Sequence, residues 1–209
     1  MAGEPLPVVI IGVGGFGANA LAAAARSEAV RVVGVADRDA AAAQRAARQV
    51  NAEAYTDNRR LLAETQPAAA YLAVPPPAAP ELVAAGGERG IAVWKEAPLG
   101  RDLAEGSAMV RRMDKARLPF AVGTQRRFAA GYRRAWELRS ELGELFLARA
   151  HYLFNWGPSL GWRGDRQAAG GGALLELGTH PVDLLVWLLG LPEVAYGVTA
   201  GAPGAGRAD

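Results

Sequence analysis

The sequence predicts an α/β fold built on a doubly wound parallel sheet, and three observations support this fold class. The first is an unbroken apolar run at residues 8–11, typical of a parallel strand with both faces covered. The second is the glycine run that follows, Gly12, Gly14 and Gly17, spaced G-x-G-x-x-G before an alanine-rich helix expected over residues 18–25. The third is a regular alternation of apolar strands with helical segments as far as residue 123.

The glycines have separate mechanical tasks where the first strand meets the helix. Gly12 permits a tight turn, Gly14 leaves room for a pyrophosphate to approach the backbone, and Gly17 lets the helix pack closely on the strand. The start of the helix, with Gly15 and Phe16, offers unpaired N–H groups and a partial positive charge to phosphates. The segment therefore predicts a dinucleotide site, although glycines also mark ordinary turns.

An acid stands where such a site needs one. A second apolar strand at residues 30–36 ends at Asp37, the position that holds the adenosine ribose hydroxyls in dinucleotide-binding units. The alternative is that Asp37 only caps the next helix. A carboxylate here favours NAD over NADP because it repels a 2′-phosphate, whereas the guanidinium of Arg38 could bind that phosphate.

The rest of the first half alternates between helices and strands. Pro75 follows one strand in a run of three prolines, and with Val74 it forms a loop at the carboxyl end of that strand, where cofactors lie in such sheets. The alternative for this loop is a rigid connection and nothing more. Residues 55–57 are expected to be a short link. We expect helices over residues 39–50, 58–64, 80–86 and 103–116, and strands over 68–74, 91–95 and 120–123.

The character of the sequence changes near Thr124, which predicts a dinucleotide domain at residues 1–123 and a second domain at 124–209. In the second domain we expect a helix through Tyr132 that Gly143 terminates, strands at 145–154 and 193–200, and a disordered tail at 201–209. The loop at 155–167 carries Trp162 among several large side chains. These either line a substrate pocket or fill the space between two domains; the others are Trp156, Pro158 and Arg163.

A polar stripe interrupts an otherwise apolar helix predicted over residues 173–185. Glu176, His180 and Asp183 are spaced to share one helix face, and Pro181 is expected to kink the helix near residue 177. A buried histidine between two carboxylates would be held oriented and would suit a general acid–base. The alternative is an exposed face on which these side chains are only solvated.

Composition excludes several function classes. The chain has no cysteine and two histidines, which excludes disulfides, thiolate catalysis and the Cys- or His-rich metal sites, so we expect no metal. A formal charge of +2 gives no strong field for nucleic acid. No signal peptide is visible and the longest strongly apolar run, residues 184–189, is too short to span a bilayer, so we expect a cytoplasmic protein without membrane contact.

With these pieces together, the sequence resembles the glucose–fructose oxidoreductase / inositol dehydrogenase (Gfo/Idh/MocA) family over residues 8–200. The resemblance implies a Rossmann domain followed by an α/β domain with an open sheet, an NAD or NADP cofactor, and a sugar, polyol or similar substrate. Its carriers are the segments 12–17, 35–38, 95–99, 125–128 and 170–183. From the residue patterns and the resemblance together, we expect the following site residues: the cofactor on Gly12, Gly14, Gly15, Phe16, Gly17, Asp37, Arg38, Val74, Pro75 and Glu96, the substrate on Arg126, Trp162 and Asp183, and catalysis on His180, Glu176 and Lys95.

Three departures from the family pattern stand out. The family's Glu-Lys-Pro appears as Glu96-Ala97-Pro98, so the lysine expected to exchange a proton with the reacting oxygen is absent. Lys95 would point to the same side as residue 97 in a continuing strand, so it either fills that catalytic position or points into solvent. The family's Thr-Pro-x-x-x-His loop lacks both its threonine and its histidine here, and the sequence stops after two predicted strands of the second domain.

Two functions of different class follow. The first is an NAD(P)-dependent oxidoreductase that moves a hydride between the nicotinamide and a small alcohol or carbonyl. The second is a catalytically impaired dinucleotide-binding protein, which Ala97 and the short second domain favour; a weaker third is NAD-assisted elimination or glycoside cleavage on the same scaffold. An exposed sheet edge in the second domain also predicts association with another copy.

Overall fold

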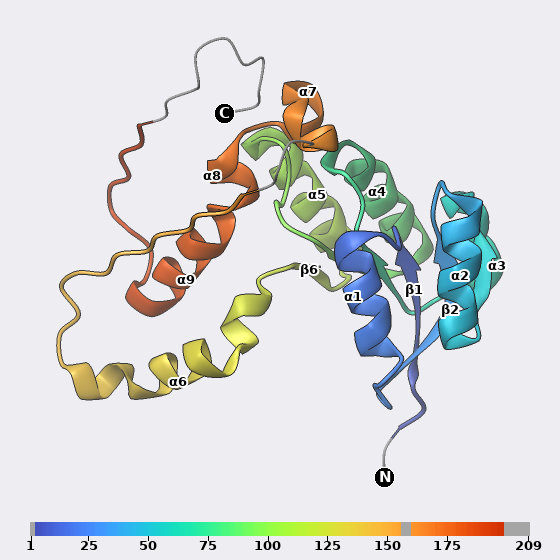
Figure 1. The fold of residues 1–209 in the computed structure, drawn as a ribbon, viewed down its shortest axis with the longest axis horizontal. Coiled ribbons are helices and arrows are strands. Elements are labelled where there is room, and N and C mark those ends of the chain that lie inside the picture. The colour runs from blue at the N-terminus through green and yellow to red at the C-terminus, as the bar shows by residue number, and fades with distance from the viewer. Residues whose placement is uncertain (1–2, 156–159, 199–209) are drawn as a thin grey trace. The chain divides into compact units, whose positions relative to one another are not determined.

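The structure is a computed structural model that describes residues 3–155 and 160–198. The chain forms two compact units, Met1–Val122 and Gly123–Asp209, called unit 1 and unit 2 below. Figure 1 colours them in chain order, unit 1 from blue to green and unit 2 from yellow to red.

Unit 1 contains a six-stranded parallel sheet in the order β3-β2-β1-β4-β5-β6. The order reverses between β1 and β4, which makes their carboxyl ends the switch point where ligands bind in open α/β sheets. The predicted fold class is confirmed, but the link expected at residues 55–57 is wrong at its start, because Tyr55 ends a short strand. The strands are β1 Leu6–Ile11, β2 Val30–Ala36, β3 Glu53–Tyr55, β4 Ala69–Leu72, β5 Ala92–Lys95 and β6 Phe120–Val122.

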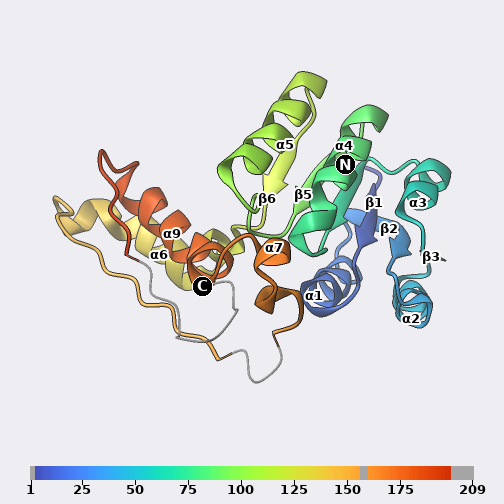
Figure 2. The same cartoon turned by 90° about the horizontal axis from the view of Figure 1, so that it is seen from above.

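Helices cover both faces of this sheet (Figure 2), with α3, α4 and α5 on one face and α1 and α2 on the other. Three of them begin at an aspartate whose carboxylate accepts backbone N–H groups: Asp39 for α2, Asp57 for α3 and Asp102 for α5. The run of prolines becomes a short 3₁₀ turn, Pro76–Ala78. The helices are α1 Gly15–Ala24, α2 Ala40–Val50, α3 Asn58–Thr65, α4 Ala79–Arg89 and α5 Leu103–Ala116.

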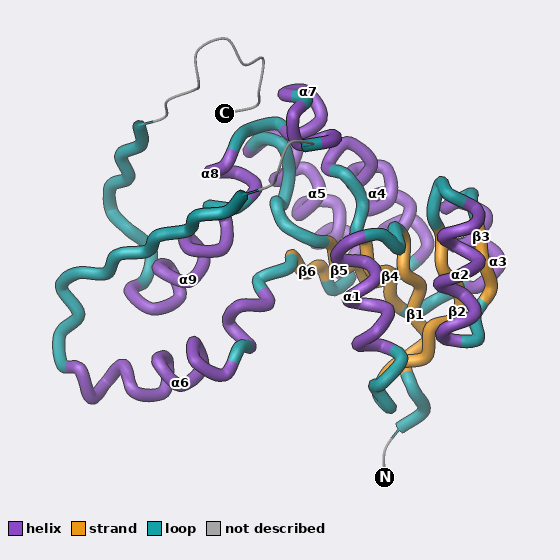
Figure 3. The backbone as a smooth tube through the Cα atoms, viewed as in Figure 1, coloured by secondary structure: helices purple, strands orange, loops and turns teal. Residues whose placement is uncertain are grey.

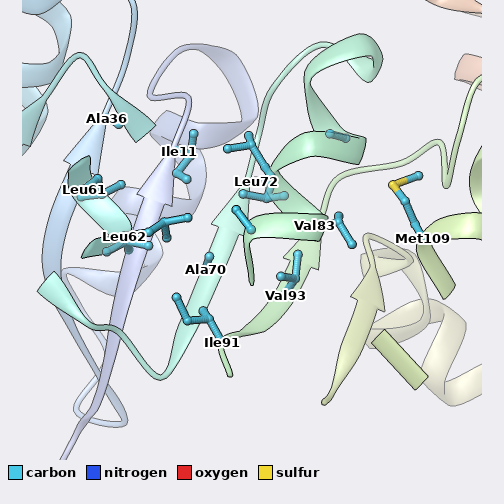
Figure 4. Packing of buried hydrophobic residues seen from close by; sticks show 14 of the residues in the cluster. Ile11, Ala36, Leu61, Leu62, Ala70, Leu72, Val83, Ile91, Val93 and Met109 are labelled. Atoms are coloured by element: carbon cyan, nitrogen blue, oxygen red, sulfur yellow. The ribbon is translucent and has the colours of Figure 1, made fainter. Parts of the chain in front are cut away.

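Each face of the sheet has its own hydrophobic core. On the α3–α5 face, Leu72, Val83 and Met113 are almost completely buried, and Figure 4 shows their neighbours interdigitating between strands and helices. On the α1–α2 face, Ile10 and Leu21 are buried together. The central strands are therefore covered on both sides, as the unbroken apolar run at β1 predicts.

Every regular element in the described residues of unit 2 is a helix or a helical turn. The strand predicted at 145–154 is wrong, and so is the strand predicted at 193–200 as far as residue 198; residues 199–200, the tail at 201–209, Trp156 and Pro158 lie outside the described residues. Figure 3 draws both described segments as loops. Alternating apolar residues indicate a strand with one buried face. A strand also needs a neighbouring strand to complete its backbone hydrogen bonds, and the described chain offers none there.

The elements of unit 2 are short except for two helices. In the described residues of unit 2, the elements are four 3₁₀ or α turns, Gln125–Phe128, Arg139–Leu142, Gly161–Gly164 and Arg166–Ala169 (α7), and the helices α6 Ala130–Leu138, α8 Ala173–Glu176 and α9 Thr179–Leu189. The single helix predicted over 173–185 is therefore broken after Glu176. The break falls at the position expected from Pro181, whose ring would strike the carbonyl of residue 177; in α9 the proline lies in the first turn, where its missing N–H costs no bond.

Polar and aromatic contacts hold α6 and α9 together. Trp136 and Trp187 stack with their ring centroids 4.6 Å apart and their planes 7° from parallel. Arg139 also packs over Trp136, with its guanidinium carbon 3.5 Å from the ring centroid. Of the described residues in unit 2, only Ala169 and Leu184 are buried hydrophobic residues. Unit 2 thus relies on surface contacts where unit 1 relies on a core.

No single helix in the described part of the chain is long and apolar enough to cross a membrane. The segments Arg166–Glu176 and Thr179–Leu189 reach the necessary length and apolarity only as a pair, with a bend of 41° between them.

Candidate functional site

The glycine loop between β1 and α1 leaves open space where a dinucleotide phosphate would approach. Gly12 has φ +86°, and a Cβ there would lie 2.3 Å from the carbonyl oxygen of Ala73. A Cβ on Gly17 would lie 1.8 Å from the carbonyl oxygen of Gly12. A Cβ on Gly14 or Gly15 would meet nothing within 4 Å. Two glycines are therefore required by packing, and two keep the loop surface bare.

The first turn of α1 faces this loop without a side-chain cap. Gly14 is the N-cap residue and makes no capping hydrogen bond through a side chain, because it has none. Phe16, next in the turn, is 47% exposed. The backbone N–H groups at the start of a helix are unpaired and carry the positive end of the helix dipole, so this turn suits an anion. The loop and the helix start together fit the pyrophosphate of a dinucleotide.

Asp37 connects the end of β2 to the glycine loop. Its Oδ2 accepts a hydrogen bond of 3.0 Å from the N–H of Val13, and its Oδ1 accepts one of 3.0 Å from the N–H of Asp39. The alternative that Asp37 caps α2 is wrong, because Asp39 occupies the N-cap position. A carboxylate has about four acceptor positions, so two remain for ribose hydroxyls. Arg38 is exposed beside it.

Glu96 follows β5, next to the end of β4 where Val74 and Pro75 begin the following loop. The Tyr71 hydroxyl donates a hydrogen bond to Oε1 of Glu96. Tyr71 also contacts the Trp94 ring edge-on, with centroids 5.4 Å apart. Burial, followed by the Glu96 carboxylate, raises the pKa of Tyr71 above its usual range, so the hydroxyl keeps its proton and remains a donor.

Lys95 does not point into solvent, so that alternative is wrong. Its side chain is 4% exposed, and its Nζ donates one hydrogen bond of 2.8 Å to the carbonyl oxygen of Glu96 and another to that of Pro98. Burial lowers the pKa of Lys95 to about 8, against partial compensation from the carboxylates of Glu105 and Glu96. The ammonium therefore contacts the backbone of the loop that contains Ala97.

In unit 2, the two carboxylates of the predicted polar stripe each bind an arginine. Glu176 accepts a 2.7 Å hydrogen bond from Nε of Arg163, and Asp183 accepts a fork of two hydrogen bonds from Arg127, the longer of them 2.8 Å. The expectation of one helix face carrying Glu176, His180 and Asp183 is wrong, because α8 ends at Glu176 before α9 begins.

His180 lies near Tyr152, with ring centroids 6.4 Å apart. Tyr152 also accepts a hydrogen bond from Nη2 of Arg126, whose guanidinium carbon lies 4.8 Å from the centre of the tyrosine ring. Sequence reasoning named Arg126 and His180 but missed Tyr152, which joins them. It also missed the arginine partners Arg127 and Arg163. No spacing in the sequence signals contacts between segments so far apart.

Trp162 is half-buried, and the guanidinium carbon of Arg163 lies 4.3 Å from its ring centroid. Trp162 is therefore packed beside the Arg163–Glu176 ion pair within unit 2. In the described ranges, no group of three or more histidine, aspartate or glutamate side chains is arranged to hold a metal ion.

Family models match almost the whole chain. Residues 6–124 match the oxidoreductase family with an NAD-binding Rossmann fold, and residues 132–209 match the GFO/IDH/MocA C-terminal domain. A comparison with curated protein sequences gives no match.

Solved structures agree with these matches. An oxidoreductase domain protein from Kribbella flavida is 29% identical with a TM-score of 0.80, over 90% of this chain and 53% of that one. The WlbA dehydrogenase from Chromobacterium violaceum, in complex with NADH and UDP-GlcNAcA, is 25% identical with a TM-score of 0.77, over 91% and 57%. A myo-inositol 2-dehydrogenase from Lactobacillus plantarum shares the fold at 21% identity and a TM-score of 0.75, over 90% and 57%.

This chain spans just over half the length of each of these structures. The sheet order and the bare glycine loop of unit 1 agree with the first family match, and the second family match covers most of unit 2. The chain belongs to the GFO/IDH/MocA family of oxidoreductases.

Proposed function

We propose that the chain binds NAD and takes part in hydride transfer to or from a sugar, a polyol or a related small alcohol or carbonyl compound. The observation that carries this proposal is the bare surface of Gly14 and Gly15 beside the uncapped start of α1, with the Asp37 carboxylate at the end of the neighbouring strand. The family match and the NADH and nucleotide-sugar named for the WlbA relative support the cofactor and the substrate class. We assign residues 1–123 to cofactor binding, and residues 124–209 to substrate binding and self-association.

In this proposal the chain's residues have distinct tasks. The glycine loop and the start of α1 hold the pyrophosphate, and Asp37 accepts hydrogen bonds from the ribose hydroxyls. Bound NAD would supply the hydride chemistry. His180 holds a proton for the substrate oxygen, and Glu176 is held in place for the same region by its hydrogen bond from Arg163. Trp162 and Asp183 line the substrate region.

Arg126 supports a polar, oxygen-rich substrate. Its Nε is buried without a hydrogen-bond partner, and its one hydrogen bond within the described residues goes to the hydroxyl of Tyr152. Arg127 and Arg163, by contrast, each bind a carboxylate. Arg126 therefore retains donors that a hydroxyl, carbonyl or carboxylate oxygen of a substrate would satisfy.

Ala97 carries the second candidate function, a dinucleotide-binding protein with impaired catalysis. Loss of one positioned general acid–base costs roughly 10²–10⁴-fold in rate. Lys95 does not offer an evident replacement, because its ammonium already donates to two backbone carbonyls. We therefore expect NAD binding with slow turnover.

Two measurements test the proposal. Titration of NAD and NADP against tryptophan fluorescence should show tighter binding of NAD, and Asp37→Ala should reduce that preference. Tighter binding of NADP would show that Arg38 decides the preference.

Absorbance at 340 nm with a panel of polyols should show slow reduction of NAD that Ala97→Lys accelerates. Ala116→Lys, at an exposed helix position, is the matched control. Absence of NAD binding by the unmodified chain would refute the proposal.

A further inference from the structure

Lys95 is an unusual choice of residue at the end of a central strand. It is the one charged side chain that is buried within the described residues. The whole chain has 23 lysines and arginines, and only Lys95 and Lys115 among them are lysines. A lysine ammonium is compact, whereas a guanidinium is a wide planar fork. The buried position therefore holds the smaller cation in a chain that otherwise uses arginine.

The side chain of Lys95 lies on the α3–α5 face of the sheet. In β5, Val93 and Lys95 are buried and Trp94 between them is half exposed, which is the alternation of a strand. Val93 belongs to the core formed with α4 and α5, so Lys95 starts from that same face. From there its Nζ reaches the carbonyl oxygens of Glu96 and Pro98.

Glu96 is also held from the other face. Tyr71 packs against the α1–α2 core, and its hydroxyl donates to the Glu96 carboxylate. The backbone of this residue is thus fixed from one side of the sheet and its side chain from the other. The loop that contains both contacts leaves the carboxyl end of β5, at the edge of the sheet that carries the glycine loop.

We propose that Lys95 is a positioning residue: its buried ammonium clamps the backbone of residues 96–98 and, together with Tyr71, presents Glu96 to the bound dinucleotide. This inference rests on the proposed NAD function. Lys95 acts through hydrogen bonds to the loop and exchanges no proton with the substrate. Burying a lysine at a position that is usually apolar costs desolvation of the ammonium. The two hydrogen bonds to the carbonyls of Glu96 and Pro98 compensate for that cost.

The clamp should weaken as Lys95 loses its proton, because a neutral amine is a poorer donor than an ammonium. The charged groups near it are Glu96 on its own loop, Glu105 in α5, and Arg101, which pairs with Glu105 through a 2.8 Å hydrogen bond. The two carboxylates favour the ammonium, and the arginine offsets Glu105. With a pKa of about 8, Lys95 should titrate between pH 7 and pH 9.

The test uses Lys95→Met, which keeps the length and loses the charge, with Lys115→Met on the exposed end of α5 as the control. Hydrogen exchange of the cofactor-free chain should become faster in the peptide that covers residues 96–101 in Lys95→Met. The Kd for NAD, measured by tryptophan fluorescence, should rise about tenfold, as expected for loss of a charge-assisted hydrogen bond. The unmodified chain should also lose NAD affinity above pH 8, and Lys95→Met should not.

Tyr71→Phe provides a second variant, which removes only the hydroxyl that binds Glu96. It should weaken NAD binding without accelerating exchange at the amide of Leu99, next to the carbonyl of Pro98 that Lys95 binds. Unchanged exchange in Lys95→Met, or faster exchange with an unchanged Kd and an unchanged pH profile, would overturn the positioning role. Failure of the unmodified chain to bind NAD would refute the proposed function instead, and the exchange measurement would still decide whether Lys95 clamps the loop.

Discussion

The two units of this chain use their apolar residues in opposite ways. In unit 1, Ile11, Leu72 and Val83 lie between the sheet and its helices with at most 1% of each exposed. In unit 2, Phe146 and Leu153 are both 93% exposed. Unit 1 closes its core with its own residues. Unit 2 is held by a tryptophan stack and by arginine–carboxylate pairs, and its apolar segments at 145–154 and 191–198 are uncovered.

The difference shows what an apolar pattern can and cannot predict. In a βαβ unit each strand is followed by the helix that covers it, so pattern and partner occur in the same short stretch of sequence. The alternating segment at 145–154 has no partner strand in the described chain. The alternating pattern indicates a strand with one buried face, but it does not show which strand would pair with it.

The largest expected effect comes from deleting the same side chain in each unit. Leu72→Ala should reduce the free energy of unfolding by about 2–5 kcal/mol, because it removes buried methyl groups and leaves a cavity. Leu153→Ala should change it by less than about 0.5 kcal/mol, because that side chain is 93% exposed. Urea denaturation followed by circular dichroism compares the two. Equal losses would mean that residues 145–154 are packed in solution.

Lys95 makes the stability of unit 1 depend on pH. Its pKa falls from an ordinary 10.5 to about 8 on folding, so below pH 8 the folded state carries the full cost of a buried charge. As pH rises from 8 toward 10.5, the folded state releases a proton that the unfolded state retains, and stability increases. The slope is at most about 1.4 kcal/mol per pH unit.

Measurement between pH 7.5 and 9.5 avoids the opposing effect of Tyr55 and Tyr71. Burial raises the pKa of Tyr55 to about 12 and that of Tyr71 further, so both weaken the fold only where unfolded tyrosine ionises, near pH 10 and above. Thermal unfolding of Lys95→Met should lack the rise over this range. A rise of equal size in that variant would assign it to another group.

The tryptophan stack is a smaller and local contribution in unit 2. Trp136→Leu should reduce stability by about 0.5–1.5 kcal/mol beyond the loss of buried area, because it removes the stack on Trp187 and the contact with Arg139. Near-ultraviolet circular dichroism should lose the signal of the stacked pair. Trp94→Leu, which removes the half-exposed ring beside Tyr71 in unit 1, serves as the comparison and should leave that signal in place.

The last prediction concerns self-association, and it involves the smallest expected change in the free energy of unfolding. The exposed apolar segments of unit 2 predict self-association at high concentration, through side chains instead of the sheet edge expected from the sequence. The double substitution Phe146→Glu with Leu153→Glu should reduce the mass measured by light scattering and leave unfolding nearly unchanged. A monomer at every concentration in the unmodified chain would contradict this prediction.

The sequence predicted much of unit 1 and part of the site. Glycine spacing and the acid after β2 depend on contacts within one βαβ unit, so Gly12, Gly17 and Asp37 could be placed from spacing alone. The pairs Arg127–Asp183 and Arg126–Tyr152 join residues 56 and 26 positions apart, and no local pattern encodes such contacts. The destination of the Lys95 ammonium was also beyond prediction, because it depends on the path of the loop after the strand.

The bond from the Val13 N–H to Asp37 has a consequence for redesign of the cofactor preference. The carboxylate that would select NAD also secures the glycine loop to the end of β2. Replacing Asp37 by a small neutral residue therefore removes a tether from the loop that we propose holds the phosphates. A successful switch needs a second substitution that restores an acceptor for this N–H. The side chain proposed to set the cofactor preference is thus also one that orders the glycine loop.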